Sequence, residues 1–304
     1  MKQKEPIRSF EQLLDLVKKN KEKRILAIAS AEGKEIIQAA KMATEEDILS
    51  PIFIGDKEKI EKICEEVDFD LGEVEIVDEK DINKTSEIAV ELVKNKKADI
   101  LMKGKMDTKS LLKAVLDKEK GLRAGKLLSH IAVVEVKNYP KLMLVTDGGM
   151  NINPDVNQKI EILKNAIDVA HRLGIEKPRI SILAAVETVN PDMPETIDAS
   201  VITKMGERGD LGEVIIDGPV AFDIAIDKKS AQVKGVDSVI AGETDIFLVP
   251  NISAGNIMVK ALIYLSDAKV GGIVVGGGVP IVLLSRSDSK EIKLYSMALG
   301  AMVS

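Results

Sequence analysis

Three apolar runs in the last third of the chain each end in polar or glycine-rich residues that could bind an anion. The runs are VII at 214–216, IFLV at 246–249 and IVLL at 281–284. In an open α/β sheet, ligands collect where strands end and helices begin, because free N–H groups and the helix dipole attract negative charge. These turns predict a phosphate-bearing substrate. Their candidate binding residues are Asp217, Gly218, Pro219, Asn251, Ser253, Gly255, Asn256, Ser285 and Arg286.

Arg286 is the residue among these that is hardest to explain by structure alone. It follows four apolar residues and Ser285. Because arginine is rarely buried without a partner, we expect one here, either a buried carboxylate or a substrate phosphate.

A second candidate phosphate site lies in LMKGKMDTKSLLKAV at 101–115. A strand is expected to end at Lys103, and Asp107 or Thr108 can cap the helix that follows. Lys109 and Lys113 would lie on the surface of that helix. Cationic side chains near free N–H groups would bind phosphate, and a solvated, lysine-rich helix start is the alternative interpretation.

Two glycine-rich segments complete the set of candidates. TDGG at 146–149 would let a ligand approach the backbone, and Asn153 beyond it is expected to cap a helix with Pro154 at its first position. Gly276 and Gly277 follow a strand-like run, where they form either a ligand contact or only a tight connection.

Several common kinds of site find no support in the sequence. Neither the G-x-x-x-x-G-K-[ST] nor the G-x-G-x-x-G fingerprint is present. The only histidines, His130 and His171, are expected to be structural, which leaves a catalytic triad or a histidine-based metal site without support. Cys64 continues an apolar helical stripe and is expected in the core. We therefore expect no metal site.

The composition predicts a folded protein with an aliphatic core. Aromatic residues make up 3% of the 304 residues and tryptophan is absent, and the net charge is -6. Both features argue against a broad nucleic-acid surface. With one cysteine, no apolar run long enough to span a bilayer and no visible secretory signal, we expect a cytoplasmic protein without membrane contact.

Strand-like and helical segments alternate along most of the chain, which predicts an α/β fold with mostly parallel sheets. Expected strands include 24–29, 51–55 and 99–104, with helices between them. From residue 130 the pattern changes to a hairpin, with HIAVVEV and LMLVT joined by KNYPK. A domain boundary is therefore expected near 128–130.

Six segments together resemble the phosphate acetyl/butyryltransferase family, and most closely its phosphate butyryltransferase branch. They are LMKGKMDT, NINPD, DGPVAFDIAI, V-x-G-x-x-S-x-x-A-G at 233–242, NISAGNI and LLSRSDS. The resemblance implies two α/β domains flanking a cleft, like those of isocitrate and isopropylmalate dehydrogenases. It places residues 1–129 with a returning C-terminal helix at 285–304 in one domain, and residues 130–284 in the other. It also implies a homodimer or higher homo-oligomer.

The implied reaction is direct acyl transfer, in which acyl-CoA and phosphate give acyl phosphate and CoA. CoA is then a substrate, and no cofactor is expected. Ser285 would hydrogen-bond the reacting group and Arg286 would hold phosphate. Lys113 falls where the acetyltransferases have a second phosphate-binding arginine.

The thiol base is the part of the family pattern from which this chain departs. The position of the acetyltransferase aspartate is Ile292 here, which leaves Asp288, Glu291 or water as candidates for that role.

Three alternatives to a butyryltransferase stay open at this point. Phosphate acetyltransferase is the nearest, although Lys113 and SRSDS favour the butyryl branch. A decarboxylating dehydrogenase would need an aspartate cluster and several arginines for its metal and its carboxylate substrate, and neither is evident. A non-catalytic acyl-CoA or phosphate sensor is less economical, because the Ser285–Arg286 and AGN segments are retained.

Overall fold

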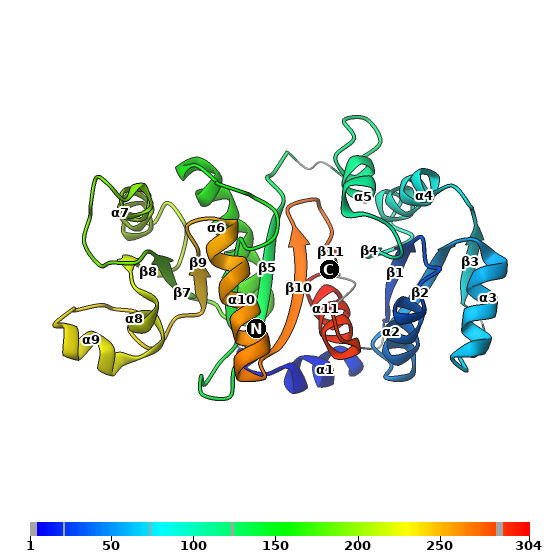
Figure 1. The fold of residues 1–304 in the computed structure, drawn as a ribbon, viewed down its shortest axis with the longest axis horizontal. Helices are drawn as coiled ribbons and strands as arrows, with labels where there is room; N and C mark the ends of the chain where they lie inside the picture. Colours follow the sequence, from blue (N-terminus) through cyan, green and yellow to red (C-terminus); the bar gives the residue numbers. More distant parts are fainter. Residues whose placement is uncertain (1–4, 21, 73, 123–124, 284–287) are drawn as a thin grey trace. The chain divides into compact units, whose positions relative to one another are not determined.

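The computed structural model describes residues 5–20, 22–72, 74–122, 125–283 and 288–304 (Figure 1). The chain divides into two units by its internal contacts. We call Phe10–Lys126 with Gly271–Ser304 the N-terminal unit, and Leu127–Val270 with Met1–Ser9 the central unit. The chain therefore passes from one unit to the other at three places.

The N-terminal unit contains strands in the order β3-β2-β1-β4-β11-β10. All neighbours are parallel except β10 and β11, which are antiparallel. The strands are β1 (Arg24–Ala29), β2 (Leu49–Gly55), β3 (Glu75–Asp78), β4 (Ile100–Lys103), β10 (Lys269–Val275) and β11 (Ile281–Val282). The first two residues of β10 belong to the central unit, and the rest of the strand belongs to this one. The helices are α1 (Phe10–Lys18), α2 (Lys34–Glu45), α3 (Lys57–Glu66), α4 (Ile82–Lys94), α5 (Thr108–Val115) and α11 (Lys290–Val303).

Residue patterning explains how this unit folds. Every residue of β4 is buried, as expected for a parallel strand that is covered on both faces. Helix α1 is amphipathic and buries Phe10, Leu13 and Val17. The Phe10 ring stacks on Tyr295 of α11 with 4.4 Å between the ring centroids, so the first and last helices of the chain pack together.

The central unit contains strands in the order β5-β6-β9-β7-β8. β5 and β6 form an antiparallel hairpin, as the sequence predicts, and the other pairs are parallel. The strands are β5 (Ser129–Glu135), β6 (Met143–Thr146), β7 (Arg179–Leu183), β8 (Ile215–Val220) and β9 (Ile246–Leu248). The helices are α6 (Val156–Arg172), α7 (Pro194–Glu207), α8 (Phe222–Ile226), α9 (Lys228–Lys234) and α10 (Ile252–Ser266).

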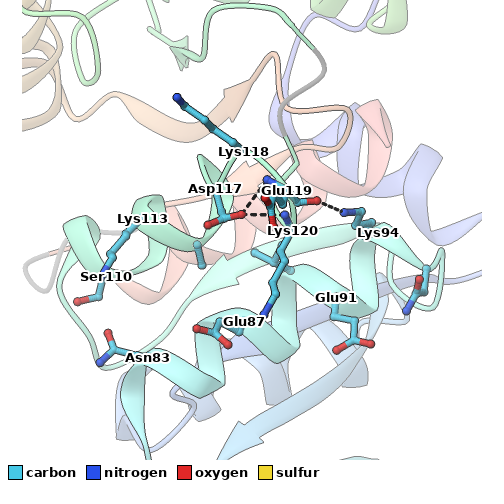
Figure 2. A pocket seen from close by; sticks show the side chains of 13 residues that line it. Asn83, Glu87, Glu91, Lys94, Ser110, Lys113, Asp117, Lys118, Glu119 and Lys120 are labelled. Atoms are coloured by element: carbon cyan, nitrogen blue, oxygen red, sulfur yellow. Dashed lines mark hydrogen bonds between the residues drawn. The ribbon is translucent and has the colours of Figure 1, made fainter.

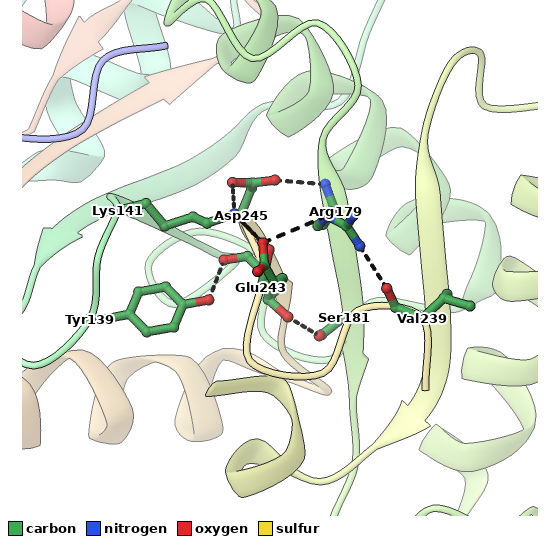
Figure 3. Close-up of polar contacts among 8 residues, drawn as sticks. Tyr139, Lys141, Arg179, Ser181, Val239, Glu243 and Asp245 are labelled. Atoms are coloured by element: carbon green, nitrogen blue, oxygen red, sulfur yellow. Dashed lines mark hydrogen bonds and ion pairs between the residues drawn. The ribbon is translucent and has the colours of Figure 1, made fainter. Parts of the chain in front are cut away.

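A polar network joins the amino ends of these central strands (Figure 3). Asp245 is 5% exposed; it pairs with Lys141 at 2.9 Å and accepts the Arg179 N–H at 2.8 Å. The Tyr139 hydroxyl donates to the Thr244 carbonyl at 2.7 Å. The network holds the first residues of β7 and β9 in place. It therefore lies at the opposite edge of the sheet from the carboxyl ends of these strands.

The predicted α/β class with mostly parallel strands is confirmed. The two units meet in sequence at 9/10, 126/127 and 270/271, whereas the expected domains placed residues 1–9 with the first domain and 271–284 with the central strands. Residues 271–283 belong with the N-terminal unit because Val274 pairs with Ile281, and β11 pairs with β4. No helix in the described part of the chain is long and apolar enough to cross a membrane.

The prediction that Asn153 caps the long helix is wrong. Helix α6 begins two residues later, and its cap is Asp155, whose side chain accepts the Gln158 N–H at 2.9 Å. Gln158 returns a bond by accepting the Asp155 N–H at 3.0 Å. This reciprocal capping box satisfies two backbone donors at once, and Asn153 lies exposed outside it.

The predicted strand end at Asp217 is also wrong. β8 continues through Gly218 and Pro219 to Val220, which pairs with Leu183 of β7. β8 is the last strand in the order of the central unit, where a proline costs no ladder hydrogen bond on its outer side. A shift in the β7–β8 register between Ser181 and Leu183 accompanies it.

Candidate active site

Two of the predicted turns of the central unit are in direct contact. The TDGG segment begins at Thr146, the last residue of β6, and the NISAGN segment begins α10. A Cβ atom on Gly148 would lie 2.8 Å from the carbonyl carbon of Gly255, so only glycine allows this approach. The Asn256 side-chain amide donates to the Gly148 carbonyl at 3.3 Å. The structure therefore brings Gly255 and Asn256 together with the first glycine turn.

Asp147 organises that turn, and the sequence reasoning did not single it out. It is 2% exposed, and its carboxylate accepts the N–H groups of Gly149 and Met150 at 2.8 and 2.9 Å. The Asn151 side-chain amide donates to it at 2.6 Å. The available signal was an aspartate that directly follows the buried strand LMLVT and precedes two glycines.

Most of the backbone N–H groups at the start of α10 donate hydrogen bonds within the protein. The Asn251 side chain caps it by accepting the Ala254 N–H at 3.0 Å, and the Ile252 N–H donates to the Ile152 carbonyl at 3.1 Å. Ser253 is exposed between them. Any anion bound here would meet the Ser253 N–H and hydroxyl and the Asn256 amide, rather than a full set of free N–H groups.

The DGP segment is joined to a second family-like motif. Asp217 accepts the Gly218 N–H at 2.8 Å and the Ser238 hydroxyl at 2.5 Å. Ser238 is the serine of the V-x-G-x-x-S-x-x-A-G run. The Asp217 carboxylate thus accepts hydrogen bonds from groups within the protein. Pro219 is buried inside β8.

In the N-terminal unit, Lys103 is buried at the end of β4. Its ammonium group donates to the Met106 carbonyl at 3.1 Å and the Gly104 carbonyl at 3.4 Å. Asp107, rather than Thr108, caps α5, and a hydrogen bond from the Ser110 side chain lowers the pKa of Asp107. Thr108 is the exposed first residue of the helix. Lys103 and Thr108 thus lie on either side of the loop at 104–107.

Lys113 lies in a different environment, beside a pocket of about 760 Å³ between α4 and α5 (Figure 2). Lys94 at the edge of this pocket donates to the Glu119 carbonyl at 2.8 Å. No ion pair includes Lys113 within the described ranges. Four lysines and four acidic residues line the pocket, namely Lys94, Lys113, Lys118, Lys120, Glu87, Glu91, Asp117 and Glu119. Lys103 is not among the lining residues.

The remaining predicted residues follow β10 and β11. Gly276 and Gly277 come directly after β10. Ser285 and Arg286 lie outside the described residues.

The two side chains considered as thiol bases are both described. Asp288 is half-buried, and its carbonyl accepts the Lys293 ammonium group. The pKa of Glu291 is lowered by its own backbone N–H and by a hydrogen bond from Ser289, which makes its carboxylate a weaker base.

Cys64 occupies the core, as the sequence predicts, with 1% of its surface exposed. Burial, with a smaller effect from the negative charge of Glu61, raises the pKa of its thiol from 9.0 to about 11. A neutral, buried thiol is a poor nucleophile.

The family model for phosphate acetyl/butaryl transferase matches residues 9–87 and 79–301. The chain belongs to this family. It is 43% identical over 297 residues to the phosphate butyryltransferase of Clostridium acetobutylicum, with 98% of each chain covered. It is 39% identical over 277 residues to the phosphate acetyltransferase of Thermotoga maritima, with 91% of this chain and 94% of the relative covered.

A solved structure shows the same relationship. The branched-chain phosphotransacylase from Enterococcus faecalis V583 has a TM-score of 0.80 and 34% identity, and the match covers 92% of this chain and 99% of that one. As a member of the phosphate acetyl/butaryl transferase family, the chain is an acyltransferase. The predicted family resemblance is confirmed.

Proposed function

We propose that this enzyme interconverts butyryl-CoA and phosphate with butyryl phosphate and CoA. The observation that carries the proposal is the 43% identity to a phosphate butyryltransferase along 98% of both chains. A phosphate oxygen attacks the thioester carbonyl carbon, the C–S bond breaks, and the CoA sulfur leaves as a thiolate that takes up a proton. This balance requires no redox cofactor, so we propose none.

We propose separate tasks for the candidate residues. From the sequence, Arg286 holds the reacting phosphate and Ser285 hydrogen-bonds the reacting group. Lys113 is an exposed cation without an ion pair in the described part of the chain, beside a pocket large enough for part of a phosphorylated substrate. Positioning and charge stabilisation can provide most of the catalysis in such a direct transfer.

We also propose that the enzyme is a homodimer that assembles through α10. This helix has a single charged residue, Lys260, in 15 residues, and the structure leaves Ile257, Tyr264 and Leu265 exposed at 69%, 69% and 86%. An apolar helix face of this kind marks an interface, and a second copy would cover it with the same apolar face. Acyl-CoA as substrate supports a cytoplasmic location.

The proposed reaction is tested by following free thiol release from butyryl-CoA with and without phosphate. Acetyl-CoA and longer acyl-CoAs serve as comparisons. We expect phosphate-dependent release that is fastest with butyryl-CoA. Arg286→Ala should lower the rate by about a hundredfold, since a charge-assisted contact to the reacting phosphate would be lost. If none of the acyl-CoAs gives thiol release that depends on phosphate, the proposed reaction is excluded.

The proposed dimer has its own test. Light scattering of the purified enzyme should give twice the mass of one chain, and Leu265→Glu should reduce it to that of one chain. A wild-type mass of one chain would contradict the dimer.

A further inference from the structure

Among the described residues of the central unit, the buried carboxylate of Asp147 accepts the most hydrogen bonds. Besides Gly149, Met150 and the Asn151 amide, it accepts the backbone N–H groups of Asn151 at 3.3 Å and of His130 at 3.1 Å. Five N–H groups therefore converge on one side chain that is 2% exposed. Such a set of donors is what makes a buried carboxylate tolerable.

The bonds to Asp147 fix the backbone that α10 rests on. On the other side of the turn, Gly148 contacts Gly255, and the Gly148 carbonyl accepts the amide of Asn256. Gly149 lies against the imidazole of His130, where an added Cβ would be 2.8 Å from the ring. Any movement of the Gly148–Gly149 turn would displace Asn256, the side chain at the exposed start of α10.

We infer that Asp147 is a positioning residue for acyl transfer that acts through Asn256, which the sequence predicts as a substrate-binding residue. This inference rests on the function proposed above. Its carboxylate holds the 147–151 turn in the one conformation that seats Asn256 and the first turn of α10. It also occupies the N–H groups of Gly149, Met150 and Asn151, so the substrate phosphate binds to other donors. Asparagine cannot replace it, because an amide offers one acceptor oxygen and would direct its NH₂ group at these donors.

A double-mutant cycle in the full enzyme tests whether Asp147 acts through Asn256. Asp147→Asn and Asn256→Ala should each lower kcat/KM by about tenfold, the loss expected when one hydrogen bond that positions the site is removed. The double variant should be no more than about twofold worse than either single variant, because residues that act through one contact are not additive. Fully multiplied losses, or an unchanged kcat/KM for Asp147→Asn, would overturn the inference.

Asp245→Asn is the matched control. Asp245 is another buried carboxylate of the central unit, bonded to a backbone N–H and a lysine at the amino ends of the strands. Its replacement should lower resistance to denaturant but leave kcat/KM of the folded enzyme unchanged. A loss of kcat/KM equal to that of Asp147→Asn would show a general effect of losing a buried charge and would overturn the inference.

Hydrogen exchange measured by mass spectrometry tests the positioning without any activity. Asp147→Asn should speed exchange in peptides covering 252–257 as well as 147–152, and Asp245→Asn should not. Asn151→Ala keeps the Asp147 carboxylate but removes the side-chain amide that donates to it at 2.6 Å. It should therefore speed exchange in the same two peptides, but by less. This variant serves as the test if Asp147→Asn does not fold. Unchanged exchange at 252–257 in both variants would overturn the inference, even if the proposed reaction is itself not observed.

Discussion

Gly148 and Gly255 lie backbone to backbone, so that a Cβ atom on Gly255 would be 2.8 Å from the Cα of Gly148. The two residues come from different sequence motifs, one after β6 and the other in the first turn of α10. Their contact joins two segments that the sequence predicts separately, one as a close approach for a ligand and the other as an anion-binding turn. The residues at this contact are therefore constrained by packing as well as by any ligand.

Gly255→Ala should destabilise the protein and reduce its activity. The new methyl group would meet backbone atoms that cannot rotate away, and overpacking of this kind costs about 1–3 kcal/mol. Denaturant unfolding and the thiol-release assay would measure the two effects. Gly209→Ala is the control, because a Cβ at Gly209 would have no atom within 4 Å, although the φ of this residue is +85°. This variant should lose stability through backbone strain alone and keep its activity. Wild-type stability in Gly255→Ala would refute the predicted clash.

Asp155→Ala should lower the free energy of unfolding by about 1 kcal/mol, because α6 would lose its N-cap and the capping box with Gln158. Asn153→Ala is the matched variant, since asparagine is an equally good cap by residue type but lies outside the helix. Its free energy of unfolding should stay within about 0.5 kcal/mol of the wild type. Urea denaturation of both variants measures this, and equal losses would contradict the assignment of the cap.

Lys113→Ala should raise the KM for a phosphorylated substrate by roughly tenfold and change kcat little, as expected when a charge contributes to binding rather than to the reaction step. Lys84→Ala, an exposed lysine of α4 that does not line the pocket, should leave both constants unchanged. Steady-state kinetics with phosphate and acyl-CoA varied in turn would show which substrate is affected. A wild-type KM for both substrates would remove Lys113 from the site.

Cys64 should react slowly with a thiol reagent in the native enzyme and rapidly once the chain is unfolded. Its pKa is about 11 in the folded state against 9.0 as the ordinary value, so the unfolded chain ionises first. The stability that comes from keeping this thiol neutral is therefore complete below about pH 9 and is lost as the pH rises toward 11. Cys64→Ala should show a smaller fall in stability over that interval, and identical pH profiles would contradict the assignment.

The sequence predicts the elements whose signals are local. The strand at 24–29 and the hairpin of β5 and β6 follow from apolar runs of strand length separated by turn residues. The core position of Cys64 follows from its place in a helical stripe. In each of these cases residues near in sequence decide the outcome.

The errors arise where two local signals compete or where distant pairing decides. Asn153 and Asp155 are both good caps, and the choice depends on Gln158, which reciprocates only with Asp155. The continuation of β8 through Pro219 depends on its place at the end of the strand order. The short helices α8 and α9 were not predicted, because each spans fewer than eight residues and has little periodicity.

The role of Asp147 could not be derived from sequence, because it depends on backbone groups that only the fold brings together. His130 lies on β5 and Gly149 follows β6, and both donate to the same carboxylate. Periodicity gives no information on such convergence. The Lys113 pocket depends in the same way on the packing of α4 against α5.

Phosphorus NMR of the enzyme with butyryl-CoA and inorganic phosphate tests the transfer of an acyl group to phosphate most directly. We predict a new acyl phosphate resonance that grows as free thiol appears, in equal amounts, and disappears when CoA is added in excess. Thiol release with free butyrate and no acyl phosphate resonance, under conditions in which added butyryl phosphate is stable, would show hydrolysis and contradict the proposed function.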